Sequence, residues 1–279
     1  MSQRPIGIFD SGVGGLTVFK EIARLLDEEL IYLGDTARVP YGNKGAATVV
    51  RYALEAANFL LSRQVKMLVV ACNTASAVAL PFLEERFRVP VLGVIEPGAR
   101  KAAAVTGNGR VGVIGTAATI GSGAYTRAIR ACRPDIEIFT QACPLFVPLV
   151  EEGWVEHPVA RLVAEEYLRP LAERGIDTLV LGCTHYPMLK KVLRGVLGEA
   201  VHLVDSGAET ALTVTSILRE QGLVRPLPAL RPRFFVTDSP AHFERVGGAF
   251  LGKRLAHVQR VELGMAAPAV ATPEEGNEK

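Results

Sequence analysis

The segments KMLVVACNTASA (residues 66–77) and DTLVLGCTHYPM (residues 177–188) are alike, and together they decide the fold. In each, an apolar run typical of a buried strand leads directly to a cysteine, and small polar residues follow. The glycine-bearing runs IGIF (residues 6–9) and VGVI (residues 111–114) are separated by a similar interval. The sequence therefore predicts two related halves, each with a strand that delivers a thiol.

Short β-branched runs alternate with segments rich in Ala, Leu, Glu and Arg along the whole chain. We expect strands at residues 5–9, 30–33, 66–71, 90–94, 110–114, 136–140, 177–181, 201–204 and 234–237. The alternation predicts an α/β fold of two similar three-layer domains with mostly parallel sheets. The two domains are expected to be related by pseudo-twofold symmetry, with the active site in the cleft between them.

We place a discontinuous N-terminal domain at residues 1–97 and 208–264, and a second α/β domain at residues 98–207. Residues 265–279 are rich in Ala, Pro, Gly and Glu, so we expect a disordered tail there.

The composition restricts the classes of function. The chain has 279 residues, 49 % of them apolar, and its 31 basic and 29 acidic residues leave a net charge of +2. This balance argues against nucleic acid as a partner. No apolar stretch reaches the roughly 20 residues of a membrane span, and no leader precedes the first strand, so we expect no membrane and a cytoplasmic location.

The four cysteines, Cys72, Cys132, Cys143 and Cys183, form no CxxC pair, and we predict neither disulfides nor a metal site. Ligands of parallel sheets bind beyond the carboxyl ends of the strands, where Cys72 and Cys183 are expected. A lone thiol is usually a packing residue, but two at matching positions favour chemistry. Cys132 and Cys143 have no such mates and are interpreted as structural.

Two residues near these thiols have side chains that can carry protons. Asp10, in the glycine-rich segment FDSGVGGLT (residues 9–17), ends the strand expected beside that of Cys72. The alternative is that Asp10 or Ser11 only caps a helix. The segment lacks the spacing of a phosphate-binding loop. His185 lies two residues after Cys183, within reach of the same cavity.

Two further segments are open to two interpretations from the residues alone, and a third has a simple structural one. Glu151 and Glu152 follow what we interpret as an apolar loop, CPLFVPLV (residues 143–150), and could be a solvated pair. The segment PYGNKG (residues 40–45) could be a turn or could bind a carboxylate through backbone amides and a Tyr hydroxyl. VDSG (residues 204–207) is most simply a helix cap and a link between the domains.

Two thiols on opposite walls of a cleft suit a reaction that approaches one carbon from both faces, such as racemisation at an α-carbon. One cysteine removes the proton as a thiolate while the other delivers a proton as a thiol. A thiol with a pKa of about 8.5 is little ionised at neutral pH, so each needs a helper. No lysine stands at a matching strand end to anchor pyridoxal phosphate, which favours catalysis without a cofactor.

The motifs GIFDSGVGGLTV, DTARVPYGNK, VVACNTASA, CPLFVPLVEEG and LVLGCTHYPML give this chain its resemblance to bacterial glutamate racemases, of the cofactor-independent aspartate/glutamate racemase superfamily. The resemblance covers nearly the whole chain. It implies that Cys72 and Cys183 are the acid/base pair and that Asp10, Glu151 and His185 assist them, with Glu151 matching the motif better than Glu152. It implies that glutamate is held by Asp10, Ser11, Tyr41, Gly42, Asn73, Thr74, Thr184 and His185.

The resemblance further implies that the protein converts L-glutamate to D-glutamate for peptidoglycan, without a cofactor and as a homodimer. A racemase acting on aspartate or another acidic amino acid would use the same cysteine pair. A cysteine hydrolase would need only one thiol. A non-catalytic sensor that binds an acidic amino acid between two lobes would need neither.

Overall fold

The computed structural model describes residues 2–264, so the tail expected to be disordered lies outside the described residues. The strands are β1 (Ile6–Asp10), β2 (Leu30–Gly34), β3 (Met67–Val70), β4 (Val91–Gly93), β5 (Arg110–Gly115), β6 (Glu137–Ala142), β7 (Thr178–Gly182), β8 (His202–Asp205), β9 (Arg233–Val236) and β10 (Val258–Arg260). The helices are α1 (Leu16–Leu25), α2 (Ala46–Ser62), α3 (Asn73–Arg86), α4 (Ile95–Val105), α5 (Ala117–Gly121), α6 (Ala124–Cys132), α7 (Phe146–Glu151), α8 (Pro158–Ala172), α9 (Lys190–Leu197), α10 (Ser206–Glu220) and α11 (Pro240–Leu251), with short 3₁₀ turns η1 (Tyr41–Asn43) and η2 (Tyr186–Leu189).

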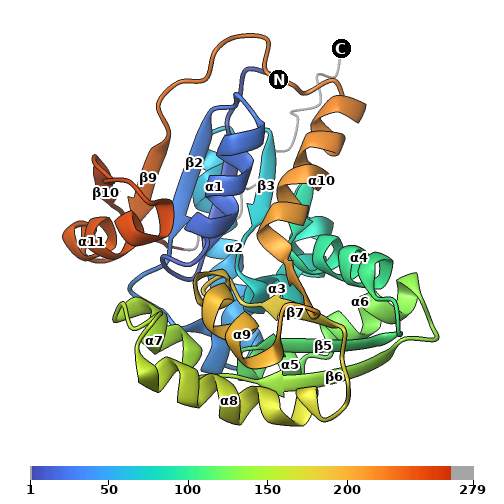
Figure 1. Cartoon of the computed structure of the whole chain (residues 1–279). Coiled ribbons are helices and arrows are strands. Elements are labelled where there is room, and N and C mark those ends of the chain that lie inside the picture. Colours follow the sequence, from blue (N-terminus) through green and yellow to red (C-terminus); the bar gives the residue numbers. More distant parts are fainter. Residues whose placement is uncertain (1, 265–279) are drawn as a thin grey trace, which may run out of the picture.

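The strands form two sheets, of order β10-β9-β2-β1-β3-β4 and β6-β5-β7-β8 (Figure 1). Each pairing between neighbouring strands is parallel. The order β2-β1-β3-β4 in the first sheet is repeated as β6-β5-β7-β8 in the second, as two related halves require. The predicted α/β fold with two parallel sheets is confirmed, whereas the domain boundaries at residues 97 and 208 stay a prediction.

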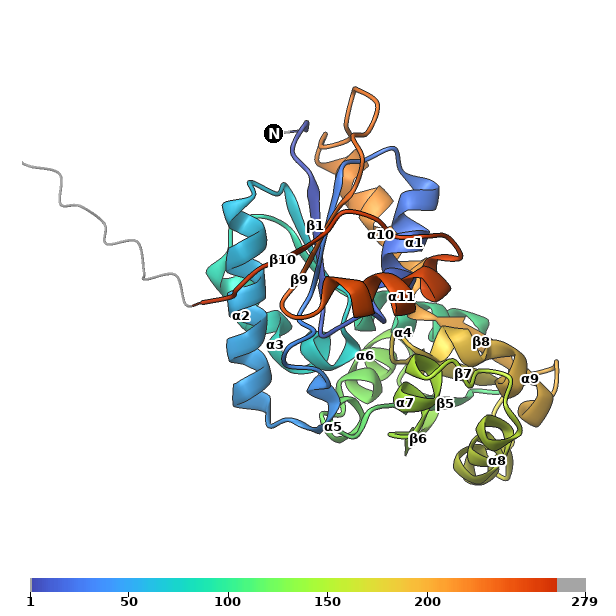
Figure 2. The same ribbon diagram turned by 90° about the vertical axis from the view of Figure 1, so that its left-hand side faces the viewer.

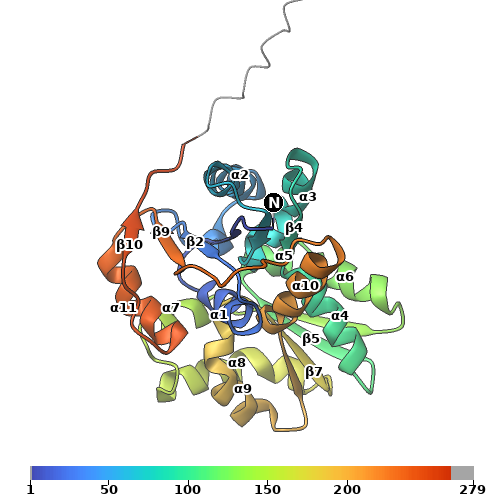
Figure 3. The same ribbon diagram turned by 90° about the horizontal axis from the view of Figure 1, so that it is seen from above.

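Helices cover both faces of the first sheet. The side chains of Ile6 and Ile8 on β1 belong to a core with α1, α10 and α11, whereas Phe9 belongs to a core with α2 and α3. Figures 2 and 3 show α2 and α3 on one side of this sheet and α1 and α10 on the other. Because both faces are covered, the strands are continuous apolar runs rather than alternating ones.

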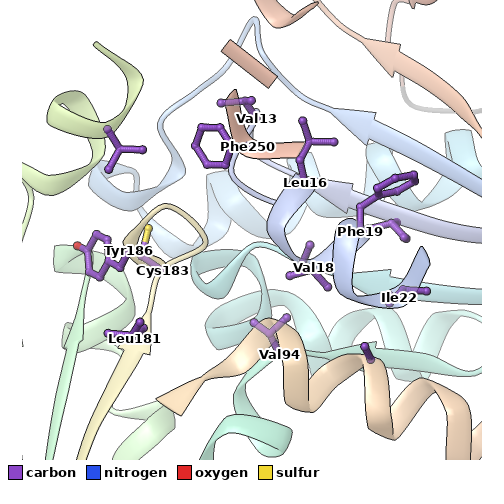
Figure 4. Close-up of a cluster of buried hydrophobic side chains, with 14 of the residues drawn as sticks. Val13, Leu16, Val18, Phe19, Ile22, Val94, Leu181, Cys183, Tyr186 and Phe250 are labelled. Atoms are coloured by element: carbon purple, nitrogen blue, oxygen red, sulfur yellow. The ribbon is translucent and has the colours of Figure 1, made fainter. Parts of the chain in front are cut away.

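The second sheet is covered in the same way. Val111 and Val113 of β5 pack with α4 and α6, whereas Ile114 of β5 lies in the core that includes α8 and α9. This last core continues from α1 in the first half to Leu181 and Cys183 at the end of β7 (Figure 4). The two halves therefore share apolar packing beside the cysteine.

Three local predictions were tested by the helix ends. Asp205 caps α10 as expected, because its carboxylate accepts a hydrogen bond from the backbone N–H of Gly207. The suggested cap by Asp10 or Ser11 is wrong, because α1 starts after Gly15 without a side-chain cap. The predicted loop at residues 143–150 is also wrong in part, since α7 begins within it. Pro148 lies in the first turn of α7, where the backbone N–H groups have no partner within the helix, so the proline does not break it.

In the part of the chain that the structure covers, residues 2–264, each helix is too short or too polar to cross a membrane.

Candidate active site

Cys72 lies two residues past the end of β3 and is the N-cap residue of α3. Its sulfur accepts a hydrogen bond from the backbone N–H of Ala75 at 3.5 Å and lies 3.8 Å from the hydroxyl oxygen of Ser11. The side chain is almost fully buried, with 5 % of the residue exposed. The helix N-terminus and the hydroxyl are therefore the polar groups closest to this sulfur.

Asp10 ends β1, which pairs directly with β3, as the sequence predicted. Its Oδ2 accepts a hydrogen bond from the Gly12 N–H at 2.9 Å, while the buried Oδ1 has no partner among the described residues. Burial raises the pKa of Asp10, and the positive charge of His185 partly opposes this. Burial, together with the nearby charge of Asp10, raises the pKa of Cys72 to about 12, so this thiol keeps its proton at neutral pH.

Cys183 occupies the matching place after β7, but its surroundings differ. Its sulfur lies 3.9 Å from Nδ1 of His185, and Nε2 of His185 lies 2.9 Å from Oε1 of Glu151. Burial by itself would lower the pKa of His185, but the hydrogen bonds to Cys183 and Glu151 outweigh it and raise that pKa to about 10. An imidazolium at neutral pH therefore faces the Cys183 sulfur.

The choice between the adjacent glutamates follows from this geometry. Glu151 contacts His185, whereas Glu152 is exposed and lines a separate apolar cavity with Trp154. The last turn of α7 directs only Glu151 toward the histidine. Sequence spacing alone did not separate these two residues.

A small cavity is lined by both cysteines. Its volume is about 30 Å³, close to the space of one water molecule. It is lined by Ser11, Val39, Pro40, Tyr41, Gly42, Cys72, Asn73, Thr74, Thr116, Val147, Cys183, Thr184 and His185. The cavity thus includes the predicted binding residues apart from Asp10, which lies just behind Ser11. Glu151 instead lines an adjacent cavity of about 290 Å³, which shares Val39 with the inner one.

The segment PYGNKG contains the turn η1 and brings Tyr41 and Gly42 to the cavity. The Tyr41 hydroxyl, however, donates to the buried carboxylate of Asp35, so it is occupied within the protein. A Cβ atom at Gly42 would lie 2.6 Å from Cβ of Thr116, which leaves room only for glycine. Backbone groups, rather than the tyrosine hydroxyl, are therefore what this segment offers to a ligand.

Sequence reasoning missed Thr116 and its neighbour Thr119. The Thr116 hydroxyl lies 3.0 Å from that of Thr74, and Thr119 lies 3.2 Å from Thr74, so these hydroxyls form a cluster across the two halves. Thr116 follows the glycine-bearing strand β5, and the same strand-end rule that selected Asp10 would have found it. The apolar liners Val39, Pro40 and Val147 carry no comparable signal.

The structure has a larger cavity elsewhere, away from the two cysteines. This cavity of about 610 Å³ lies between α3, α4 and α10 beside β4, and it contains none of the predicted site residues. Within residues 2–264, no group of three or more His, Cys, Asp or Glu side chains is arranged to hold a metal ion. The cysteine cavity therefore remains the candidate site.

A family model described as Asp/Glu/Hydantoin racemase matches residues 6–214. The chain belongs to this family. The racemase fold predicted from the sequence motifs is therefore confirmed.

Individual racemases resemble the chain over most of their length. It is 59 % identical to a glutamate racemase of Geobacter metallireducens over 265 residues, which are 94 % of this chain and 98 % of the relative. The crystal structure of glutamate racemase isoform RacE1 from Bacillus anthracis superposes with a TM-score of 0.91 at 40 % identity, covering 94 % of this chain and 99 % of that one. Glutamate racemase from Francisella tularensis in complex with D-glutamate gives a TM-score of 0.89 at 40 % identity, covering 94 % and 98 %.

Proposed function

We propose that this protein is a glutamate racemase that interconverts L-glutamate and D-glutamate with two cysteines and no cofactor. The observation that carries the proposal is that Cys72 and Cys183, from matching positions of two related halves, line one cavity. The glutamate racemases to which the chain is similar, one of them in complex with D-glutamate, support the choice of substrate.

The resemblance to glutamate racemases associates Cys183 with L-glutamate and Cys72 with D-glutamate, which gives the following course for the L to D direction. Cys183, as a thiolate beside the His185 imidazolium, takes the α-proton of L-glutamate. Cys72 then gives its proton to the opposite face of the same carbon, and D-glutamate results. The enzyme is left with a protonated Cys183 and a deprotonated Cys72, so it is ready for the reverse reaction.

Proton carriers act at both sulfurs: Asp10 at Cys72, and His185 together with Glu151 at Cys183. The Asp10 carboxyl, whose pKa burial raises, can protonate or deprotonate Cys72 between turnovers. Glu151 holds the ring of His185 and stabilises its positive charge. The outer end of this pair is partly open, since the side chain of Glu151 is 28 % exposed. Protons can therefore reach solvent on the Cys183 side through Glu151.

The remaining residues of the cavity hold the substrate. Ser11, Asn73, Thr74 and Thr184 offer hydroxyl and amide groups to the two carboxylates, together with backbone groups at Tyr41 and Gly42. The unpaired Oδ1 of Asp10 suits the α-ammonium group. Both interactions would fix the α-carbon between the sulfurs.

Glutamate is several times larger than the water-sized cavity, so the residues around it must move to admit substrate. Closure afterwards excludes water and strengthens each electrostatic contact inside. In the cell, the enzyme would supply D-glutamate for peptidoglycan, acting in the cytoplasm as a homodimer, as the family resemblance implies.

The test is proton exchange in deuterium oxide. Purified protein is incubated with L-glutamate and, in parallel, with L-aspartate, without added cofactor, and the α-proton and both enantiomers are followed. Deuterium in newly formed D-glutamate supports the proposal. Exchange with aspartate alone keeps the chemistry but overturns the substrate, and binding without exchange of either amino acid indicates an acidic amino-acid sensor.

A further inference from the structure

Tyr125 links the two cysteine-bearing turns, although it does not line the cavity. It lies near the start of α6 in the second half and is 2 % exposed. Its hydroxyl donates a hydrogen bond of 2.7 Å to Oδ1 of Asn73, the first residue of α3 and the neighbour of Cys72. This bond therefore passes from the second half of the molecule to the first.

The ring of Tyr125 fits between two glycines. A Cβ atom at Gly182 would lie 3.0 Å from Cε2 of the ring, and one at Gly98 would lie 3.5 Å from Cε1. Gly182 directly precedes Cys183 in the chain. Because both walls are formed by glycines on α4 and β7, the ring is held closely and its hydroxyl has a fixed position.

The hydrogen bond determines which end of the Asn73 amide faces the cavity. Oδ1 is used by Tyr125, while Nδ2 is buried and has no partner among the described residues. A buried donor without a partner is costly, so such a group is usually satisfied by a ligand or water. Asn73 lines the cysteine cavity. Burial raises the pKa of Tyr125, so the hydroxyl stays protonated and remains a donor.

We propose that Tyr125 is a positioning residue: it locks the Asn73 amide so that Nδ2 donates to a carboxylate of the substrate. The proposal rests on the proposed function, since the ligand is an acidic amino acid. Without the tyrosine hydroxyl, the amide can rotate and present its oxygen to the carboxylate, which repels it. Tyr125 thereby acts on substrate binding through Asn73 and not on the proton transfers.

The test compares Tyr125→Phe, which keeps the ring between the glycines, with wild type and with Tyr167→Phe. Tyr167 also lies in the second half and its hydroxyl contacts the Leu145 N–H, so it controls for loss of a tyrosine hydroxyl. We expect Tyr125→Phe to raise the KM for glutamate about tenfold while kcat changes less than threefold. Tyr167→Phe should leave both constants unchanged.

A double-mutant cycle with Asn73→Ala separates positioning from a general structural effect. In the Asn73→Ala background, Tyr125→Phe should have less than a twofold effect on KM, because its target is gone. An unchanged KM in Tyr125→Phe, or an equal increase with and without Asn73, would overturn the proposal even if the melting temperature falls.

Asn73→Asp tests the same idea should Tyr125→Phe fail to fold. It keeps an acceptor for Tyr125 and removes the donor, so we expect KM to rise at least tenfold, and a wild-type KM would contradict the proposal. Wild-type racemisation of glutamate is measured first. Its absence would defeat the proposed function, whereas an active wild type with an unaffected Tyr125→Phe defeats only the role of Tyr125.

Discussion

The turns after β3 and β7 occupy the same place in the two halves, yet they surround their cysteines with different groups. Cys72 has a hydroxyl, a helix N-terminus and a buried carboxyl close by, and its pKa is raised to about 12. Cys183 has the imidazole of His185, whose pKa is raised to about 10. One side therefore holds a neutral thiol beside a buried carboxyl, and the other holds an imidazolium cation beside its sulfur.

This difference teaches that a repeated topology places the reacting atoms, whereas the proton chemistry is set separately at each site. Parallel strands with the same order deliver both sulfurs to one cavity. The residues that tune them come from different elements: Asp10 of β1 acts on Cys72, whereas Cys183 is faced by His185 of its own turn, which contacts Glu151 of α7. Four sets of substitutions test how far the two sides differ in function.

The largest effect is expected when either sulfur is removed. Cys72→Ala and Cys183→Ala should each reduce racemisation by at least about 10³-fold, because a two-base reaction has no substitute on the affected face. Enantiomer formation measured by circular dichroism or chiral chromatography checks this. Cys132→Ser is the control, since Cys132 is exposed at the end of α6 and should retain full activity. Substantial racemisation by either alanine variant would exclude the two-thiol mechanism.

Asp10→Asn and His185→Asn should each reduce kcat by about 10²-fold, but by slowing opposite proton transfers. The two enantiomers have equal free energy. Within any one variant, kcat/KM for the L to D direction must therefore equal kcat/KM for the D to L direction. The difference appears in isotope effects measured with α-deuterated substrates. Compared with wild type, the isotope effect should be larger with D-glutamate as substrate in Asp10→Asn. It should be larger with L-glutamate as substrate in His185→Asn. Identical isotope effects in the two variants would show that the sides are equivalent.

Gly14→Ala should reduce racemase activity about tenfold, because the added methyl group would displace Thr184 and His185 beside Cys183. A Cβ atom there would lie 2.3 Å from Oγ1 of Thr184 and 2.5 Å from Nδ1 of His185, so these groups must shift. Steady-state kinetics and the melting temperature are the measurements. Gly45→Ala is the matched control, because nothing lies within 4 Å of the added atom. Equal behaviour of the two variants would mean that the packing of His185 is not critical.

Glu151→Gln should have the smallest effect at neutral pH, a few-fold loss of kcat, but it should change the pH dependence. The hydrogen bond and the negative charge of Glu151 help to raise the pKa of His185 from 6.5 to about 10, so loss of the charge should move the alkaline limb of the rate profile to lower pH. Glu152→Gln, which removes the neighbouring carboxylate, should leave the profile unchanged. The reverse result would assign the role to Glu152.

The same pKa shift affects stability. Since the pKa of His185 is raised in the folded state, its contribution to the free energy of unfolding is fully present below about pH 6.5. It is lost as the pH rises toward 10. The wild-type protein should therefore lose more stability across this range than Glu151→Gln, as denaturant unfolding at several pH values can measure.

Local patterns predicted much of this molecule. Apolar runs that end in Cys72 and Cys183 identified both strands and both thiols, and Asp10 was correctly placed beside the Cys72 strand. The prediction failed in part of the segment at residues 143–150, which was interpreted as an apolar loop. A proline in the first turn of a helix does not break it, and α7 forms there.

The sequence by itself determined the two related halves, their strands and the two thiols, because strand patterns and strand-end residues depend on nearby positions in the chain. Only the tertiary structure decided that Glu151 meets His185, that Thr116 meets Thr74, and that Tyr125 holds the amide of Asn73. These pairs join segments far apart in sequence. Their contacts depend on how the two halves pack against each other, which no local periodicity encodes.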